Sequence, residues 1–578
     1  MKRTTPRSTT ALAILATCGL LVGACGGDDD TDASPTTEAP DDGGSASEPT
    51  EEPADGGDSG DEPTEEPADG GDSGDEPTGE PADEPSSDIN ADTSRRLRLI
   101  GTAGVQQLDP VTGVVPCEVE MLRWVYDSLI YALPDGTFAP GLAESWESPD
   151  ENTFVLNLRE GVSFQDGTPF DAEAVKAHLE RGKNDPASAI SGQLESIESI
   201  EVTDDLTVVL NLSQPRAGIL PAVLADRAGM VPSPTAVEAD GDTYGANGGI
   251  GAGPYVYDSH TPAEDIHVSA WDGYWNQDQR FLAGIDMLGS ASEFQVDRIE
   301  SGEVDYSAMK DTDLPSAVAG AERGVVEYTI TPSPQYSEIY INWEIAPFDD
   351  IRVRQALQHA IDRDLLTEVL TEGSGTPAYS PIPADSWAHD PGVEGLYPFD
   401  PEKARELLAE AGYPDGVDLT VGQIEHPYYT RLAAAVQDMV SESGFNFELE
   451  SVTGAEINNR LYQLKDLPVA ITAFRGTSDP GLMLEQKFAS DANSNPAGTT
   501  VDGIDELLAE GAATVDQDAR AAAYQEVERL VMENALSVPM FHNGGLVAYV
   551  PEFKGVERGY TTCQFGDFVS VPVYFAAE

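Results

Sequence analysis

The sequence is poor in cysteine, in basic residues and in long apolar runs, and each shortage excludes a class of function. Its 578 residues include only four cysteines and seven histidines. None of these forms a CxxC pair or a His/Cys cluster at zinc-ligand spacing, so no metal site is expected. Only 31 Lys and Arg stand against 104 Asp and Glu, which gives a formal charge of −73. A surface so acidic repels nucleic acid and anionic lipid, and we expect neither as a partner of the folded part.

The longest apolar run lies near the N-terminus and is too short to cross a bilayer. Residues 11–24 (ALAILATCGLLVGA) follow Lys2, Arg3 and Arg7 and carry no charge. A spanning helix needs about 20 apolar residues, whereas this length is typical of a signal peptide. The run ends in LVGAC, which resembles the bacterial lipobox. The sequence therefore predicts a signal peptide over 1–24 and a lipid on Cys25 that anchors the chain to the outer face of the cell membrane. An ordinary secretory signal with an incidental cysteine is the alternative.

The segment after Cys25 contains no Lys or Arg as far as residue 93. The sequence EPTEEPADGGDSGD occurs at 48–61 and again at 62–75. A repeat this polar cannot bury a core, and its prolines and like charges favour an extended, solvated chain. We expect residues 25–93 to be a disordered tether that lifts a domain away from the membrane. Low-complexity sequence of no selected length is the alternative.

From residue 94 onward, strand and helix patterns alternate. Alternating apolar residues predict strands over 97–100, 153–158 and 207–212. Asp400 as N-cap, Pro401 at the first helical position and Gly412 as a stop predict one helix. Further apolar stripes predict a helix after Asp349 and Asp350, and one or two more over 504–532. This alternation predicts an α/β protein with mixed sheets and at least two lobes.

Motifs of the common enzyme classes do not occur in the sequence. GxSxG, HExxH and GxxxxGK[ST] are missing, and the Gly-rich segment 245–254 (GANGGIGAGP) lacks the lysine of a phosphate loop. We therefore nominate no catalytic residue and no cofactor, and we expect a binding protein.

Seven motifs in order along the chain carry a resemblance to a known family. They are LDP at 108–110; the stretch 126–181 with LAESW at 142–146 and FQDGTP at 164–169; GAGPY at 251–255; SGEVD at 301–305; PFDDIRVRQALQHAID at 347–362; 404–412 followed by YPDG; and 524–541 ending in VPMF. Together they resemble the family 5 extracytoplasmic solute-binding proteins, the oligopeptide, dipeptide and nickel type that feed ATP-driven importers. Asp166 to Pro169 and Asp350 with Arg352 have turn and helix-start chemistry, so they are expected to be scaffold.

The resemblance implies a two-lobed, periplasmic-binding-protein-like fold of type II, in the large variant with an inserted subdomain and a hinge. Lobe 1 would comprise 94–136, 241–335 and 546–578, the inserted subdomain 137–240, and lobe 2 336–545. The protein would be a monomer that captures a peptide or peptide-like solute between its lobes and delivers it to an ABC permease. A membrane-anchored sensory receptor without transport, or a binder of sugars or metal chelates, are the alternatives. A neighbouring permease gene would distinguish the transporter from the sensor.

The resemblance also implies which residues touch the solute. They are Val115, Pro116, Tyr336, Tyr340, Trp343, Trp387, Phe474, Arg475, Thr477, Asp479 and His542. Peptide-binding relatives carry an Asp shortly before the Asp-Pro step that pairs with the peptide amine. Here that stretch reads FRGTS, and Asp479 would substitute only with a shifted backbone. Arg475 instead offers a fork of donors suited to a carboxylate or phosphate. The hypothesis is that Arg475 makes an amine clamp of the usual kind unfavourable.

Cys117 follows the LDP motif and Cys563 lies in the C-terminal tail, and the resemblance implies that both belong to one lobe. Two cysteines in an exported chain predict a disulfide that closes a very long loop. Two free buried thiols are the alternative.

Overall fold

The computed structural model describes residues 89–101, 105–113, 118–133, 135–290, 294–556 and 568–577. All of these belong to one compact unit. The signal peptide, Cys25, most of the expected tether, Val115, Pro116, Cys117 and Cys563 lie outside the described residues. No helix in the described ranges has the length and apolarity needed to cross a membrane.

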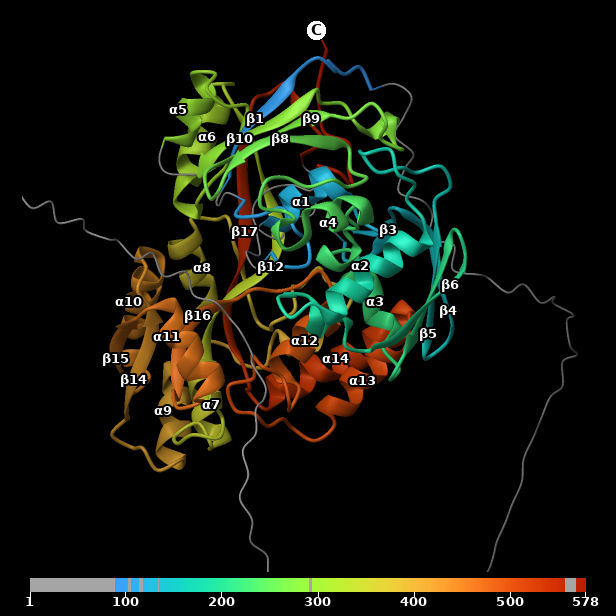
Figure 1. The fold of residues 1–578 in the computed structure, drawn as a ribbon. Coiled ribbons are helices and arrows are strands. Elements are labelled where there is room, and N and C mark those ends of the chain that lie inside the picture. Colours follow the sequence, from blue (N-terminus) through green and yellow to red (C-terminus); the bar gives the residue numbers. More distant parts are fainter. Residues whose placement is uncertain are drawn as a thin grey trace, which may run out of the picture. The chain divides into compact units, whose positions relative to one another are not determined.

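One mixed sheet of eleven strands dominates the fold, with the path β15-β14-β16-β12-β17-β11-β1-β10-β9-β8 and β13 paired to β17 (Figure 1). Parallel pairs join β1 to β10 and β11, and β14 to β15 and β16, while the other pairs are antiparallel. The strands are β1 Arg96–Gly101, β8 Tyr255–Thr261, β9 Asp265–Ala270, β10 Gly284–Ser290, β11 Tyr306–Ala308, β12 Glu327–Ile341, β13 Thr376–Pro377, β14 Val417–Ile424, β15 Phe445–Val452, β16 Val469–Phe474 and β17 Val538–Tyr549.

Strands β12 and β17 run through the middle of this sheet and join its two ends. The first part of β12 pairs with the last part of β17, beside β11. The last part of β12 pairs with β16 on one side and with the beginning of β17 on the other. The register shifts between Pro332 and Tyr336, where three residues of β12 oppose Asn543 alone. This bulge interrupts the pairing of β12 with β17 in the middle of the main sheet.

Smaller sheets complete the structure. A four-stranded antiparallel sheet has the order β4-β5-β7-β6, and two hairpin-like pairs are β2-β3 and β18-β19. Their strands are β2 Ile130–Ala132, β3 Phe138–Pro140, β4 Ala143–Asp150, β5 Thr153–Leu158, β6 Ile197–Asp204, β7 Thr207–Leu212, β18 Phe553–Lys554 and β19 Tyr574–Phe575. The strands predicted over 97–100, 153–158 and 207–212 are confirmed as β1, β5 and β7.

Most of the helices begin at a side-chain cap that the sequence provides. They are α1 Glu118–Tyr126, α2 Ala172–Asn184, α3 Leu220–Leu224, α4 Pro234–Asp240, α5 Gln295–Glu300, α6 Leu314–Glu322, α7 Ile351–His359, α8 Arg363–Thr371, α9 Pro401–Glu410, α10 Pro427–Ser441, α11 Gly454–Asn458, α12 Pro480–Phe488, α13 Ile504–Ala513 and α14 Gln517–Glu533. The predicted start of α9 is confirmed, because the Asp400 side chain accepts from the Lys403 amide. Gly412 follows that helix with a φ of +99°, which glycine adopts at little cost.

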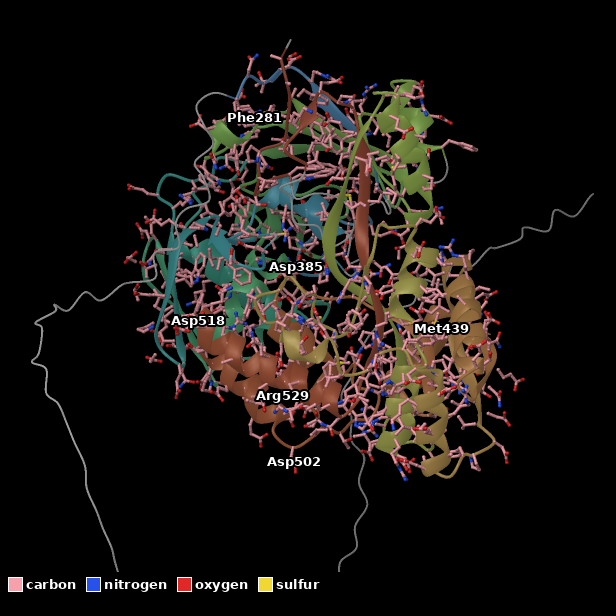
Figure 2. All side chains as sticks on the ribbon, turned by 180° about the vertical axis from the view of Figure 1, so that it is seen from behind. Phe281, Asp385, Met439, Asp502, Asp518 and Arg529 are labelled. Atoms are coloured by element: carbon pink, nitrogen blue, oxygen red, sulfur yellow. The ribbon has the colours of Figure 1, made fainter. Side chains whose placement is uncertain are left out.

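Buried apolar residues form separate cores. One lies mainly between 129 and 231, around the four-stranded sheet and α2. A second joins β1, α1 and β8–β10 to the C-terminal residues 547–575, with a smaller cluster around α5 and α6 beside it. Two more lie between 336 and 541, one around α7–α10 and one around α11–α14. The acidic excess lies outside these cores, as the exposed Asp385, Asp502 and Asp518 illustrate (Figure 2).

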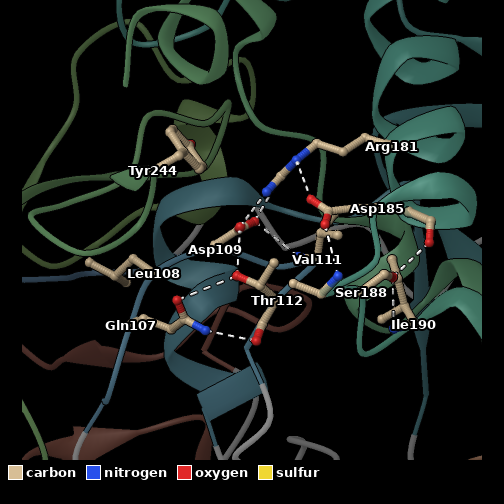
Figure 3. Close-up of polar contacts among 12 residues, drawn as sticks. Gln107, Leu108, Asp109, Val111, Thr112, Arg181, Asp185, Ser188, Ile190 and Tyr244 are labelled. Atoms are coloured by element: carbon tan, nitrogen blue, oxygen red, sulfur yellow. Dashed lines mark hydrogen bonds and ion pairs between the residues drawn. The ribbon is translucent and has the colours of Figure 1, made fainter. Parts of the chain in front are cut away.

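Two of the family-like motifs, at Asp166 and Asp350, have the structural roles predicted for them, and Asp109 of the LDP motif has a structural role that was not predicted. Asp109 of the LDP motif is buried, and its carboxylate receives both Nη atoms of Arg181 on α2, at 2.9 Å from Nη1 and 2.5 Å from Nη2, and the Val111 amide (Figure 3). Asp166 accepts from the amide and hydroxyl of Thr168 and from the Ser233 hydroxyl. Asp350 caps α7 by accepting from the Arg352 amide. These carboxylates hold loops in place and are engaged within the protein.

Candidate functional site

Three of the predicted site residues lie in one row across the centre of the sheet. Tyr336 on β12 is paired with Phe474 on β16 and with His542 on β17. The ring centroids are 5.9 Å apart for Tyr336 and Phe474, and 5.6 Å apart for Tyr336 and His542. All three side chains are buried, directly beside the register shift of β12. Burial lowers the pKa of His542 to about 4, so its imidazole is neutral at physiological pH.

The segment that follows β16 carries the accessible part of this region. Arg475 is exposed to solvent. Even so, the protein around it lowers the pKa of Arg475 by desolvation, against the opposing effects of Glu120 on α1 and Tyr429 on α10. Its guanidinium therefore lies within electrostatic reach of residues on both α1 and α10. The next residue, Gly476, packs against the bulge of β12, because a Cβ there would stand 2.4 Å from the Pro334 carbonyl oxygen.

Asp479 has a structural role at the start of α12. Its side chain is fully buried, and its Oδ1 accepts from the Leu482 amide at 3.0 Å as the N-cap. Its Oδ2 accepts from Arg520 Nη2 at 2.7 Å. Thr477 donates its hydroxyl to the Asp479 carbonyl at 2.7 Å. Both carboxylate oxygens of Asp479 are thus engaged, which agrees with the sequence hypothesis that it could meet a ligand amine only after a backbone shift.

A buried ion pair beneath the row was not predicted from the sequence. Lys487 on α12 and Glu338 on β12 are both almost fully buried, and the ammonium contacts both carboxylate oxygens. It also donates to the Tyr336 hydroxyl at 2.8 Å and lies 4.4 Å from the Tyr340 ring centroid. Burial lowers the pKa of Lys487 to about 8, against the attraction of Glu338. The only sequence signal was a lysine within the apolar helix PGLMLEQKF.

Tyr340, Trp343 and Trp387 belong to the core around α11–α14. Tyr340 is buried there, and Trp343 donates its indole N–H to the Thr499 hydroxyl at 3.3 Å. Trp387 is half-buried, with the Arg520 guanidinium 5.3 Å from its ring. They share that core with Tyr336 and Phe474, and Tyr340 lies opposite Ala470 in the sheet rather than opposite a residue of the row. Their predicted contact with a solute stays a prediction.

A second polar group that sequence reasoning missed joins α14 to the loop before α9. Glu528 is fully buried and accepts from His389 Nδ1 at 2.9 Å, from the Asp390 amide at 2.5 Å and from the Ser380 hydroxyl. Burial raises the pKa of Glu528 above that of an ordinary carboxyl, and the bonds from His389 and Ser380 oppose this rise. These three donors give Glu528 a structural role, because they tie α14 to the segment 380–390, which contains Trp387.

Among the described residues, no group of three or more His, Cys, Asp or Glu side chains could hold a metal ion. The chemistry gathered at the row is that of noncovalent recognition. It consists of aromatic faces, one accessible guanidinium and a neutral imidazole.

Comparison with known proteins gives a family by sequence and a shared fold by structure. Residues 137–495 match the model of the bacterial extracellular solute-binding proteins, family 5 Middle. The glutathione-binding protein GsiB of Salmonella paratyphi A is 29% identical over 415 residues, covering 69% of this chain and 79% of that protein. HbpA2 of Haemophilus parasuis superposes with a TM-score of 0.73 at 23% identity, over 84% of this chain and all of that one. DppA of Helicobacter pylori in complex with the peptide STSA gives a TM-score of 0.69 at 21% identity, over 84% of this chain and 98% of that one.

Proposed function

The chain belongs to the bacterial extracellular solute-binding proteins of family 5, and from this premise we propose that it captures a peptide or peptide-like solute between its two lobes and delivers it to an ABC importer. This family consists of binding proteins and not of enzymes. The observation that carries the proposal is the row of Phe474, Tyr336 and His542 on the strands that join the lobes. A solute that contacts this row would touch the strands on which the lobes turn.

The connection between the lobes supports a binding cycle of opening and closing. Strands β12 and β17 lie side by side in the middle of the main sheet, with β16 beside β12 and β11 beside β17, and the bulge at 333–335 interrupts their pairing. A bulge absorbs changes in twist at low cost, so the lobes can rotate about it. A solute shifts this equilibrium only by its preference for the closed form, and that preference must come from contacts made by both lobes.

The proposed solute class rests on the relatives and on Arg475. One relative is named for binding glutathione, and a structural neighbour was solved with the peptide STSA. Arg475 carries a planar guanidinium at an exposed position, and such a group favours a carboxylate or phosphate oxygen. The carboxylate of Asp479 accepts hydrogen bonds from Arg520 and from the Leu482 amide at the start of α12. Asp479 therefore offers no free carboxylate oxygen to a ligand amine. We propose a peptide-like solute that presents an acidic group to Arg475.

Purification of the protein from its native host under mild conditions tests the function. Native mass spectrometry should find a bound solute with at least one carboxylate or phosphate and with amide bonds. The identified compound, added back to protein stripped by partial unfolding, should bind with a one-to-one stoichiometry in calorimetry. A sugar or a metal chelate as the bound compound would contradict the peptide-like assignment, and binding outside the region between the lobes would contradict the site.

The role of Arg475 is tested by replacing this residue and measuring the affinity of the variant for the compound identified above. Arg475→Ala should weaken its binding by about 10- to 100-fold, because a charge-assisted hydrogen bond is lost. Arg475→Lys should recover part of the affinity. The matched control is Arg405→Ala, since Arg405 is also exposed but bonds to the end of α10 at Glu442. Unchanged affinity in Arg475→Ala would remove the acidic-group assignment while leaving the solute-binding function intact.

We also propose the remaining organisation in the form that the sequence suggests. The buried cores support the division into lobe 1 (94–136, 241–335, 546–578), the inserted subdomain (137–240) and lobe 2 (336–545). The signal peptide, a lipid on Cys25 and the acidic tether of 25–93 would place the domain on the outer face of the membrane. Cys25→Ala should release the protein from the membrane fraction, and retention of that variant would contradict the lipid anchor.

A further inference from the structure

A bidentate ion pair joins the inserted subdomain to lobe 2. Arg216 precedes the short 3-10 turn Ala217–Ile219, and Glu485 lies on α12. Nη1 and Nη2 of Arg216 donate to the two carboxylate oxygens of Glu485 at 2.6 Å and 2.7 Å. The side chains are only 20% and 30% exposed. An ion pair with two parallel bonds and partial burial is of the stronger kind.

The turn beside Arg216 is fitted closely to the neighbouring helix of lobe 2. A Cβ on Gly218 would stand 2.0 Å from the Thr514 carbonyl oxygen and 3.0 Å from those of Gly511 and Ala512. The turn therefore rests on the C-terminal end of α13, where only glycine fits. Leu482 of α12 packs against the core of the subdomain. In Figure 1 the helices α12–α14 lie beside α2 and α3. The ion pair is thus part of a closely packed contact that also includes Gly218 and Leu482, and not an isolated pair of surface charges.

Helix α12 carries this contact and two others that lead to the centre of the sheet. It begins at Asp479, directly after the segment with Arg475. Two residues after Glu485, Lys487 is buried against Glu338 on β12 and against the Tyr336 hydroxyl. A shift of α12 relative to β12 would break this buried ion pair, which is costly. The helix is therefore fixed to the strand on which the lobes turn, and any rotation of lobe 2 moves Glu485 relative to Arg216.

We propose that Arg216 and Glu485 form a latch that holds the inserted subdomain to lobe 2, and that α12 couples the opening of this latch to the rotation of the lobes about β12. The latch stabilises the arrangement in which the subdomain and lobe 2 touch. Opening of the lobes requires its two charges to separate. This device is independent of which solute binds and is tested without one.

Hydrogen exchange measured by mass spectrometry on the ligand-free, full mature chain tests the latch. Exchange of native amides reports the free energy of local opening. Arg216→Met and Glu485→Gln should each speed exchange about three- to tenfold in 215–221 and 508–516, and leave β14 and β15 unchanged. The exchanged pair Arg216→Glu with Glu485→Arg should restore at least half of the protection. Gly218→Ala, which forces the turn away from α13, should give the same pattern as the single variants.

The matched control is Arg460→Met, which removes an ion pair of 2.8 Å with Glu450 that lies wholly within lobe 2. The rate of amide exchange in 215–221 should be the same in this variant as in the unmodified protein. Wild-type exchange in both single variants would overturn the latch. So would an increase spread evenly over all cores, because this would indicate general destabilisation instead of a separated contact.

Discussion

At the scale of single residues, Lys487 and Glu338 carry a large desolvation cost, because both are charged and buried next to the bulge of β12. Each has lost nearly all contact with water, and each is compensated by the other and by hydroxyl groups of Tyr336 and Ser537. Such a pair adds little stability compared with apolar residues, but the removal of one partner leaves a buried charge without compensation. The pair therefore fixes the position of α12 on β12 more than it adds to the free energy of unfolding.

Lys487→Met should lower the free energy of unfolding by about 3–5 kcal/mol, because Glu338 is then buried without a cation. The double variant Lys487→Met with Glu338→Gln should recover much of this loss. Urea unfolding followed by fluorescence measures both. Lys403→Met removes an exposed pair with Glu406 and should cost less than about 1 kcal/mol. A double variant as unstable as the single one would contradict this account.

Two buried histidines make stability depend on pH below neutrality. Burial lowers the pKa of both His178 and His542 to about 4, whereas an unfolded histidine has a pKa of about 6.5. Between these values the unfolded chain binds protons that the native protein does not, so stability falls as the pH drops from 6.5 to 4. Each histidine can contribute up to about 3 kcal/mol to this fall.

Urea unfolding at several pH values between 7 and 4 checks this prediction. His178→Gln and His542→Gln should each flatten the pH dependence. His426→Gln, which changes an exposed imidazole, should leave the slope unchanged. Parallel curves for the unmodified protein and the two buried-site variants would show that other groups cause the acid destabilisation. His389 works in the opposite direction, because Glu528 and Glu394 outweigh burial and raise its pKa.

At the scale of elements, local sequence signals located strands and helices well. Strands β5 and β7 have the bounds that their alternating pattern predicts, and α9 begins and ends at its cap, proline and glycine. That Tyr336, Phe474 and His542 border one site was predicted only through a resemblance, since their segments lie far apart in the chain, and their pairing across the sheet was not predicted. The partner of Lys487 could not be predicted, because a helical pattern shows which face is apolar but not which strand it will cover. The same holds for Arg216 and Glu485.

The bulge of β12 is tested by filling the space that Gly476 leaves. A Cβ there would stand 2.4 Å from the Pro334 oxygen and 2.5 Å from the Pro334 Cβ, and neither atom can move without the backbone. Gly476→Ala should therefore lower the free energy of unfolding by about 1–3 kcal/mol and speed amide exchange around 332–337. Gly454→Ala is the control, because nothing lies within 4 Å of its Cβ position. Equal effects of the two substitutions would contradict a tight contact at the bulge.

At the scale of the whole molecule, the predicted Cys117–Cys563 disulfide would close most of the folded chain into one loop. Such a loop is expected to add about 6 kcal/mol in the chain-entropy model. Intact-mass measurement after alkylation under denaturing conditions without reductant should find neither cysteine modified. Two alkyl groups on these cysteines would show two free thiols instead. Reduction before alkylation supplies the control in which both react.

The position of β17 has a consequence for how the protein is made. This strand lies between β12 and β11 in the middle of the main sheet, yet its residues 538–549 follow every other strand of that sheet in the chain. A chain that emerges N-terminus first, from a ribosome or through a translocation channel, cannot fill this place until residue 549 has emerged. Pairings so distant in sequence also form slowly. The main sheet thus closes only after all of its other strands have emerged, and β17 is the strand that completes it.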